Sequence, residues 1–340
     1  MVRVEAATAC QLRCPTCPTG DGKTRDTIGI GYLSPENFET LLEKSPWIRH
    51  VELSNWGEIF LNPRLETILE CAHRRGVTLS ADNGANFNYA ADRTLEALVT
   101  WHLRSMTCSI DGASEETYKV YRRGGSFERV VANIRRLNEL KARHGSDEPR
   151  LLWQFVAFGH NEHEIPAARS LAESLDMAFS VKLAWQDLYA DRDFSPILDA
   201  ATIRNETGTG AADRQEYYTR HGERYLQKSI CTQLWTSPQI NWDGRMLGCC
   251  VNYWGDFGNV FRDGLEETFR GEKMTYARKM LAGQAPPRAD IPCVTCTYYQ
   301  TMKQDNHWIT PGDIAPPLLP RAASAAKRLL AHLDPGDLPR

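Results

Sequence analysis

Three cysteines stand close together near the start of the chain, in the stretch "ACQLRCPTCPTG". These N-terminal cysteines, Cys10, Cys14 and Cys17, have CxxxCxxC spacing and follow directly on the apolar, β-branched run "VRVEAA". Three thiolates at this spacing can hold three irons of a cubane [4Fe–4S] cluster and leave the fourth iron without a protein ligand. A structural zinc site normally needs a fourth ligand, and the first 60 residues offer only the more distant His50. The spacing therefore favours an iron–sulfur cluster with one open position for a substrate or cofactor.

A second group of cysteines lies in the last third of the chain, within "CTQLWTSPQINWDGRMLGCC" and "IPCVTC". Four thiolates at such spacing can close an iron–sulfur cluster or a zinc site completely. We call these four the auxiliary cysteines: Cys231, Cys249, Cys293 and Cys296.

Cys250 is the thiol of this region that is left over from that set of four. We interpret it as a buried spectator beside Cys249, although an exchange of the two in register would make Cys250 the ligand. The surrounding run "INWDGRMLGCCVNYWGDFGNV" predicts a hairpin with Asp243 and Gly244 at its turn, because Asp-Gly is a preferred two-residue connection.

The composition is that of an ordinary globular protein. With 340 residues, 42% of them hydrophobic, the chain can bury a large core. Its net charge of −3 gives no electrostatic reason to expect nucleic acid or an anionic membrane as a partner. Because residues 1–30 lack the pattern of a signal peptide and no apolar run reaches the ~20 residues that span a bilayer, we expect a cytoplasmic protein. Ten cysteines in a reducing compartment indicate metal or redox chemistry, and only Cys71 and Cys108 are interpreted as core thiols.

Strand-like and helical runs alternate between the two cysteine groups. The strand-like runs are "VRVEAA", "HVELSNW", "VTLSADNG", "LRSMTCSIDG", "LLWQFVAFG" and "MAFSVKLA". The helical runs include "SPENFETLLEK", in which Ser34 is the expected N-cap. Six such units predict an α/β fold with a parallel sheet curved into a barrel or part of one. Active sites of such folds lie at the carboxyl ends of the strands, where Cys10, Glu58, Asn83 and Asp111 fall.

These motifs together resemble the radical S-adenosylmethionine (SAM) superfamily over roughly residues 2–310. After the CxxxCxxC motif come "NWGE" (55–58), "DNG" (82–84) and "SIDG" (109–112) in the family's order. "YRRGGSFERVVANI" and "NEHE" (161–164) are similar to their counterparts in the subfamily with a cysteine-rich C-terminal extension. The resemblance implies a partial (β/α)6 TIM-type barrel with a small C-terminal twitch domain, made of a β-hairpin plus a helix.

The resemblance also implies the cofactors. The open iron would chelate SAM, and the reduced cluster would cleave its C–S bond to give methionine and a 5′-deoxyadenosyl radical. The auxiliary cysteines would hold one auxiliary [4Fe–4S] cluster, which makes two clusters, because no cysteine follows Cys296. Glu58 would accept a hydrogen bond from the methionine ammonium, and Gly57 would let the backbone approach closely.

Further contacts to SAM follow from the same resemblance. Ser109 and Asp111 would bind the ribose hydroxyls, while Asn83 and Gln154 would reach the nucleoside or the carboxylate. The family commonly has an apolar or aromatic residue before the third cysteine. This chain has Thr16 there, so we do not expect that side chain to stack on adenine.

We expect four segments: residues 1–185 as the radical SAM core, 186–230 as a connecting segment, 231–310 as the twitch domain and 311–340 as a tail. The connecting segment is polar and charged, which is typical of a solvated linker. Its alternative role is to cover the barrel mouth and contact substrate through Asp191, Arg192, Arg214 or Tyr217. The tail carries one short amphipathic helix, to which we assign no chemistry.

Three functions fit this pattern. The first is a dehydrogenase similar to the deoxy-scyllo-inosamine dehydrogenase type, which would oxidise an alcohol of an aminocyclitol, sugar or nucleoside and pass the electron to the auxiliary cluster. It fits natural-product biosynthesis such as that of antibiotics. The second is a redox-neutral enzyme, either a sugar epimerase in which Cys250 returns a hydrogen atom or a decarboxylase.

The third function is peptide modification. Against it, the first strand is expected from residue 2, which leaves no room for a small leader-binding domain. A non-catalytic electron carrier would need neither "NWGE" nor an open iron. The expected partners are a small-molecule substrate and a reductant such as flavodoxin or ferredoxin, with no nucleic acid and no membrane.

Overall fold

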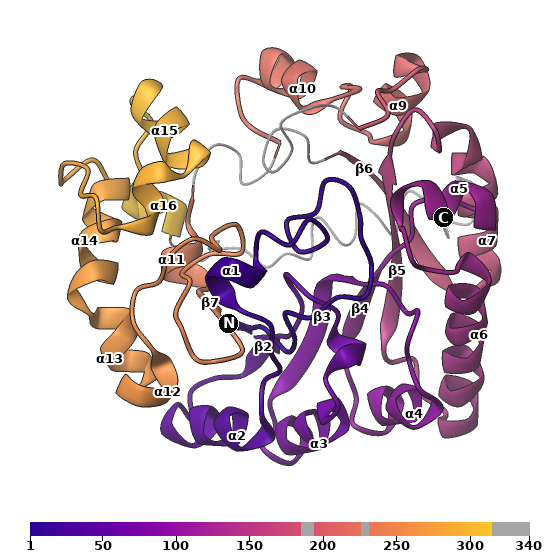
Figure 1. Ribbon diagram of the computed structural model, residues 1–340, viewed down its shortest axis with the longest axis horizontal. Coiled ribbons are helices and arrows are strands. Elements are labelled where there is room, and N and C mark those ends of the chain that lie inside the picture. Colours follow the sequence, from indigo (N-terminus) through magenta and orange to yellow (C-terminus); the bar gives the residue numbers. More distant parts are fainter. Residues whose placement is uncertain (185–193, 226–230, 315–340) are drawn as a thin grey trace, which may run out of the picture.

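The computed structural model describes residues 1–184, 194–225 and 231–314 of the chain. Its centre is a sheet of seven parallel strands in the order β6-β5-β4-β3-β2-β1-β7. The sheet curves without closing, which gives a partial barrel (Figure 1). The strands are β1 (Val2–Val4), β2 (His50–Glu52), β3 (Thr78–Ala85), β4 (Ser105–Ser109), β5 (Arg150–Ala157), β6 (Met177–Leu183) and β7 (Gln239–Ile240). The predicted α/β class and parallel sheet are confirmed.

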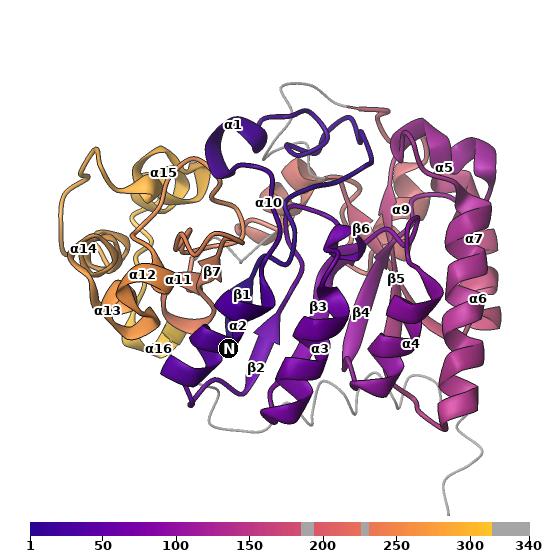
Figure 2. The ribbon, with the colours of Figure 1, turned by 60° about the horizontal axis from the view of Figure 1, so that its bottom comes forward.

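Helices alternate with the first six strands and cover the outer side of the sheet (Figures 1 and 2). Ser34 caps the first long helix as predicted, because its hydroxyl accepts the N–H of Asn37 at 3.1 Å. Within the described ranges, no helix is long and apolar enough to cross a membrane. The helices of this region are α1 (Arg25–Ile28), α2 (Pro35–Lys44), η1 (Ile59–Leu61), α3 (Leu65–Arg74), α4 (Asp92–Thr100), α5 (Glu115–Tyr121), α6 (Phe127–His144), η2 (Glu162–Glu164), α7 (Ile165–Ser174), α9 (Ala200–Glu206) and α10 (Arg214–His221).

The two faces of the sheet differ in polarity, because successive side chains of a strand point to opposite faces. The outward positions are apolar and join one core with the helices, as Val51, Met106 and Trp153 do. The inward positions are often polar: Gln154 on β5 and Lys182 on β6 both line a cavity. The inner face is therefore suited to bind a polar ligand.

The C-terminal region packs beside the first strand. Its strand β7 pairs in parallel with β1, so that Val4 lies opposite Ile240. The predicted turn forms at Gly244, whose φ of +88° suits glycine, and an isolated antiparallel bridge joins Ile240 to Met246. Around it lie α11 (Gln233–Thr236), α12 (Val260–Asp263), α13 (Leu265–Arg270), α14 (Glu272–Leu281), η4 (Pro292–Thr295), α15 (Thr297–Gln304) and α16 (Pro311–Ile314).

Candidate active site

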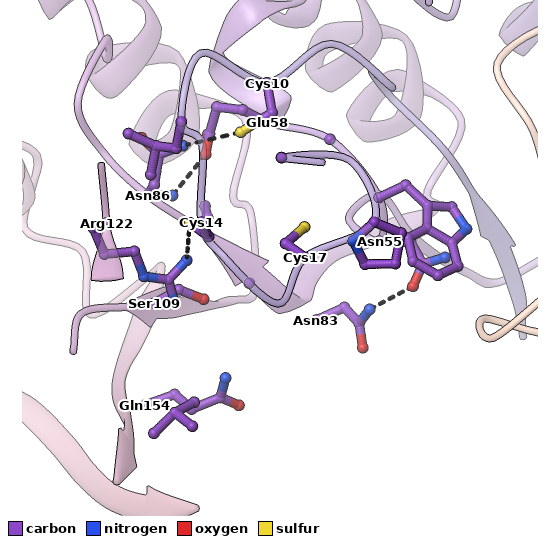
Figure 3. A pocket seen from close by; sticks show the side chains of 18 of the residues that line it. Cys10, Cys14, Cys17, Asn55, Glu58, Asn83, Asn86, Ser109, Arg122 and Gln154 are labelled. Atoms are coloured by element: carbon purple, nitrogen blue, oxygen red, sulfur yellow. Dashed lines mark hydrogen bonds between the residues drawn. The ribbon is translucent and has the colours of Figure 1, made fainter. Parts of the chain in front are cut away.

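A cavity of about 280 Å³ opens at the carboxyl ends of the strands. We call it the active-site cavity, and Figure 3 shows its walls. It brings together most of the residues that the sequence singled out for the N-terminal cluster and SAM: Cys10, Cys14, Cys17, Gly57, Glu58, Asn83, Ser109 and Gln154. These residues come from five different segments, so the fold supplies their convergence.

The loop of the N-terminal cysteines is held from two sides. Arg13 N–H donates to the carbonyl of Arg123, just after α5, at 2.9 Å. Glu58 N–H donates to the carbonyl of Ala9 at 2.8 Å. Gly57 lies so close to this loop that a Cβ there would stand 2.1 Å from the Ala7 carbonyl oxygen. A glycine is therefore required at position 57 for the "NWGE" turn to lie against the cysteine loop.

Cys14 is buried in this loop, whereas Cys10 and Cys17 are partly exposed. Burial raises the pKa of Cys14 to about 12, and the nearby Arg122 opposes that rise. Burial and the neighbouring Glu58 raise the pKa of Cys10 as well. Metal binding requires thiolates, so iron would displace the thiol protons on binding. Three cysteine sulfurs around one cavity form a donor set that fits three irons of a cubane.

Glu58 is 2% exposed, and its carboxylate is already engaged by the protein. One oxygen accepts the N–H of Phe60 at 3.3 Å and the other accepts the N–H of Asn86 at 2.6 Å. Burial raises the pKa of Glu58 to about 7. These bonds fix the "NWGE" turn to the segment after β3, and the expected contact with the SAM ammonium stays a prediction.

Asp111 is bonded within the protein. It is fully buried and is not among the residues that line the active-site cavity. One carboxylate oxygen accepts Nε of Arg122 at 2.6 Å, and the other accepts the N–H of Val156 at 2.8 Å. Both oxygens of Asp111 thus already accept hydrogen bonds within the protein, and the expected contact with a ribose hydroxyl stays a prediction. The carboxylate points into the protein because a buried cation pairs with it there.

The other predicted contacts lie on the cavity wall. Ser109 and Gln154 are register partners on β4 and β5. Asn83 Nδ2 donates to Asn55 Oδ1 at 2.5 Å, and Asn55 Nδ2 donates to the Cys250 carbonyl at 3.0 Å. These amides connect the "DNG" and "NWGE" segments to the C-terminal region.

Several side chains of the cavity wall were missed from the sequence, among them Asn86, Arg122 and Lys182. Asn86 Nδ2 lies 4.0 Å from Cys10 Sγ. Lys182 is an inward residue between two core positions of β6, and burial and the nearby Arg214 lower the pKa of its amine. The alternation of "SVKLA" was the available signal for Lys182. Arg122 lies in the stretch "YRRGGSFERVVANI", which the resemblance singled out without a role for this residue, and nothing local marks Asn86 as a neighbour of the cysteines.

The auxiliary cysteines line a second, smaller cavity, the auxiliary cavity, together with Leu234 and Phe257 among others. A hydrogen bond with Cys231, together with burial, raises the pKa of Cys249 well above its usual range. Four sulfurs around one cavity fit a closed four-iron cluster. No three of the described His, Cys, Asp and Glu side chains converge closely enough to enclose a single metal ion.

Cys249 and Cys250 face different cavities. Cys249 lines the auxiliary cavity, whereas Cys250 lines the active-site cavity with the N-terminal cysteines. The Cys250 N–H donates to Gln233 Oε1 at 3.0 Å, which fixes the backbone of this pair. Cys250 is thus only partly buried and forms part of the wall of the active-site cavity, while its role as a spectator beside Cys249 stays a prediction.

The connecting segment was assigned an alternative role in substrate contact through four residues, and the described part of it does not line the active-site cavity at these positions. Asp191 and Arg192 lie outside the described residues, as does the expected helix of the tail. Arg214 is 6% exposed and its guanidinium lies 5.0 Å from the Tyr225 ring centre. Neither Arg214 nor Tyr217 lines the active-site cavity, so the structure gives no support to a substrate contact through them.

Comparisons with known families agree with this site. The sequence profile of the radical SAM superfamily matches residues 4–152. The profile of the SPASM iron–sulfur cluster-binding domain matches residues 231–297. Among curated proteins, no sequence matches the chain. Residues 4–152 therefore form a radical SAM domain. The C-terminal region of the chain is a SPASM iron–sulfur domain, so SAM and iron–sulfur clusters are the cofactors of the chain.

Solved structures support the fold. SuiB of Streptococcus suis bound to S-adenosylmethionine aligns with a TM-score of 0.62 at 13% identity, over 88% of this chain and 71% of that chain. SuiB bound to the precursor peptide SuiA aligns with a TM-score of 0.60 at 12% identity, over 88% of this chain and 70% of that chain. BtrN in complex with AdoMet and 2-DOIA aligns with a TM-score of 0.48 at 14% identity, over 87% of this chain and 92% of that chain. At these identities the likeness to SuiB establishes a shared fold.

Proposed function

We propose that the protein is a radical SAM dehydrogenase that oxidises a secondary alcohol of a small polar metabolite to a ketone. The observation that supports this most strongly is the position of Cys249 and Cys250. Cys250 lines the active-site cavity, and the adjacent Cys249 lines the auxiliary cavity. An electron acceptor held by the auxiliary cysteines would therefore border the space in which a substrate binds.

The chemistry divides between the two sites. A cluster and SAM bound at the N-terminal cysteines would supply the hydrogen-abstracting 5′-deoxyadenosyl radical. The substrate loses a hydrogen atom from its carbinol carbon to this radical, its hydroxyl proton to water, and one electron to the cluster at the auxiliary cysteines. Ser109, Gln154 and Asn83 offer hydrogen-bonding groups on the cavity wall to a polar ligand.

The test is anaerobic reconstitution, followed by incubation with aminocyclitols, amino sugars, nucleosides and short peptides. We expect 5′-deoxyadenosine in equal amount to a product that is lighter by two hydrogens. The variant without the N-terminal cysteines should retain a reducible cluster by electron paramagnetic resonance. Zinc in place of iron at the auxiliary cysteines would remove the electron acceptor and with it the dehydrogenase.

A sugar epimerase is the second candidate, and the place of Cys250 in the cavity wall favours it. A thiol there can return a hydrogen atom to a substrate radical. Wild-type enzyme in heavy water would then place one deuterium on the inverted carbon, and Cys250→Ala would consume SAM without forming that product. Cys71→Ala is the matched control, because Cys71 is a buried thiol of α3 that lines neither cavity. A product lighter by two hydrogens, formed equally by Cys250→Ala, excludes the epimerase.

A further inference from the structure

A buried ion pair lies directly behind the N-terminal cysteines. Asp111 follows β4 and Arg122 follows α5, and their side chains are 0% and 14% exposed. Nε of Arg122 donates to one oxygen of Asp111 at 2.6 Å, while the N–H of Val156 occupies the other oxygen. The carbonyl of Asp111 is also bonded, by Asn161 Nδ2 at 3.2 Å. Asp111 is thus immobilised, and it fixes the direction in which the guanidinium points.

The other end of the guanidinium reaches a cysteine. The terminal nitrogen Nη1 of Arg122 lies 3.8 Å from Cys14 Sγ, a distance suited to an N–H···S contact (Figure 3). Cys14 itself is 5% exposed, so little water screens the interaction. Because Nε faces Asp111 and Nη1 faces Cys14, the guanidinium lies between the carboxylate and the sulfur.

We propose that Asp111 and Arg122 set the reduction potential of the N-terminal cluster, with Arg122 donating to the Cys14 sulfur and Asp111 acting as its positioning residue. The inference rests on the proposed function, in which Cys14 is a cluster ligand. Reduction adds one negative charge to a cluster. Hydrogen bonds to the ligand sulfurs and nearby positive charge stabilise that charge, so they raise the potential. Removing the guanidinium should make the cluster harder to reduce.

The main variant is the double substitution Asp111→Asn and Arg122→Gln. Arg122→Gln alone would leave a buried carboxylate without its cation, which destabilises the fold, whereas the double variant replaces the ion pair by two neutral amides. Arg122→Lys keeps the charge but loses the planar fork that engages two partners at once. Arg123→Gln is the matched control, because Arg123 is the adjacent, exposed arginine.

The measurement is a redox titration followed by electron paramagnetic resonance, with both clusters of each variant titrated in one sample. For the double variant we expect the N-terminal cluster to become at least tenfold harder to reduce, which is a shift of 59 mV to more negative potential for one electron. Arg122→Lys should shift the potential of the N-terminal cluster less. This variant replaces the double variant as the test if the double variant does not assemble the cluster. The auxiliary cluster and Arg123→Gln should keep the wild-type values.

Three results would overturn the inference. The first is an unchanged reduction potential of an intact N-terminal cluster in the double variant. If the double variant does not assemble that cluster, the same result in Arg122→Lys overturns the inference. The second is an equal shift of both clusters, which would indicate a general effect of the substitutions. The third is the absence of a cluster at the N-terminal cysteines of the wild type, which would overturn the proposed function as well and is thereby distinguished from the other two.

Discussion

Glu5→Gln should change how the stability of this protein depends on pH. Glu5 lies just after β1 and is 0% exposed. Its carboxylate accepts the N–H of Trp56 at 3.0 Å and the N–H of Gly57 at 3.1 Å. It therefore holds the "NWGE" turn that forms one wall of the active-site cavity.

The magnitude follows from the burial of this carboxyl group. Burial raises the pKa of Glu5 from 4.5 to about 7, although the bonds from Trp56 and Gly57 lower it. At 1.36 kcal/mol per pKa unit, this rise corresponds to about 3 kcal/mol. A raised pKa favours the folded state at low pH. Its contribution is complete below pH 4.5 and is lost as the pH rises through about 7.

Glutamine has the same shape as glutamate and cannot ionise. The Glu5→Gln variant therefore does not lose this stability as the pH rises. We expect the free energy of unfolding of the variant, relative to wild type, to increase by about 3 kcal/mol between pH 4.5 and pH 8. Urea unfolding across that range, under anaerobic conditions, measures the difference. Glu128→Gln, on an exposed position of α6, is the control and should show no such trend. A difference between Glu5→Gln and wild type that stays constant with pH would refute the reasoning.

Three further outcomes are expected. Alanine at any one of the N-terminal cysteines should abolish SAM cleavage and lower the iron content by about four atoms, while the auxiliary cluster remains. Full SAM cleavage by any one of these three variants contradicts the ligand assignment. Gly57→Ala should lower the cluster content, because its Cβ would lie 2.1 Å from the Ala7 carbonyl oxygen, whereas Gly312→Ala, with 3.6 Å of room, should not. Lys182→Met should stabilise the cluster-free protein by about 1 kcal/mol, since burial disfavours the charged amine; an unchanged or lower melting temperature argues against this.

Much of this protein was accessible from local sequence. The six strands and the helices between them were predicted because their hydrophobic periodicity records which face each element buries. The cap at Ser34 was equally local, since its partner is the N–H three residues later. The N-terminal cysteines were recognised for the same reason, because they lie close together in the chain. Ligands of one cluster that lie close in the chain leave a spacing that can be read directly.

Tertiary structure decided the contacts between distant segments. Asp111 turned inward because Arg122, brought back by α5, met it in the interior, and nothing in "SIDG" specifies that partner. Cys249 and Cys250 were separated into two cavities by a backbone that Asn55 and Gln233 fix from other parts of the chain. The side chains of adjacent residues enter different cavities only when distant parts of the chain have packed around them. A candidate ligand can thus be predicted from spacing, whereas the direction of a side chain depends on packing.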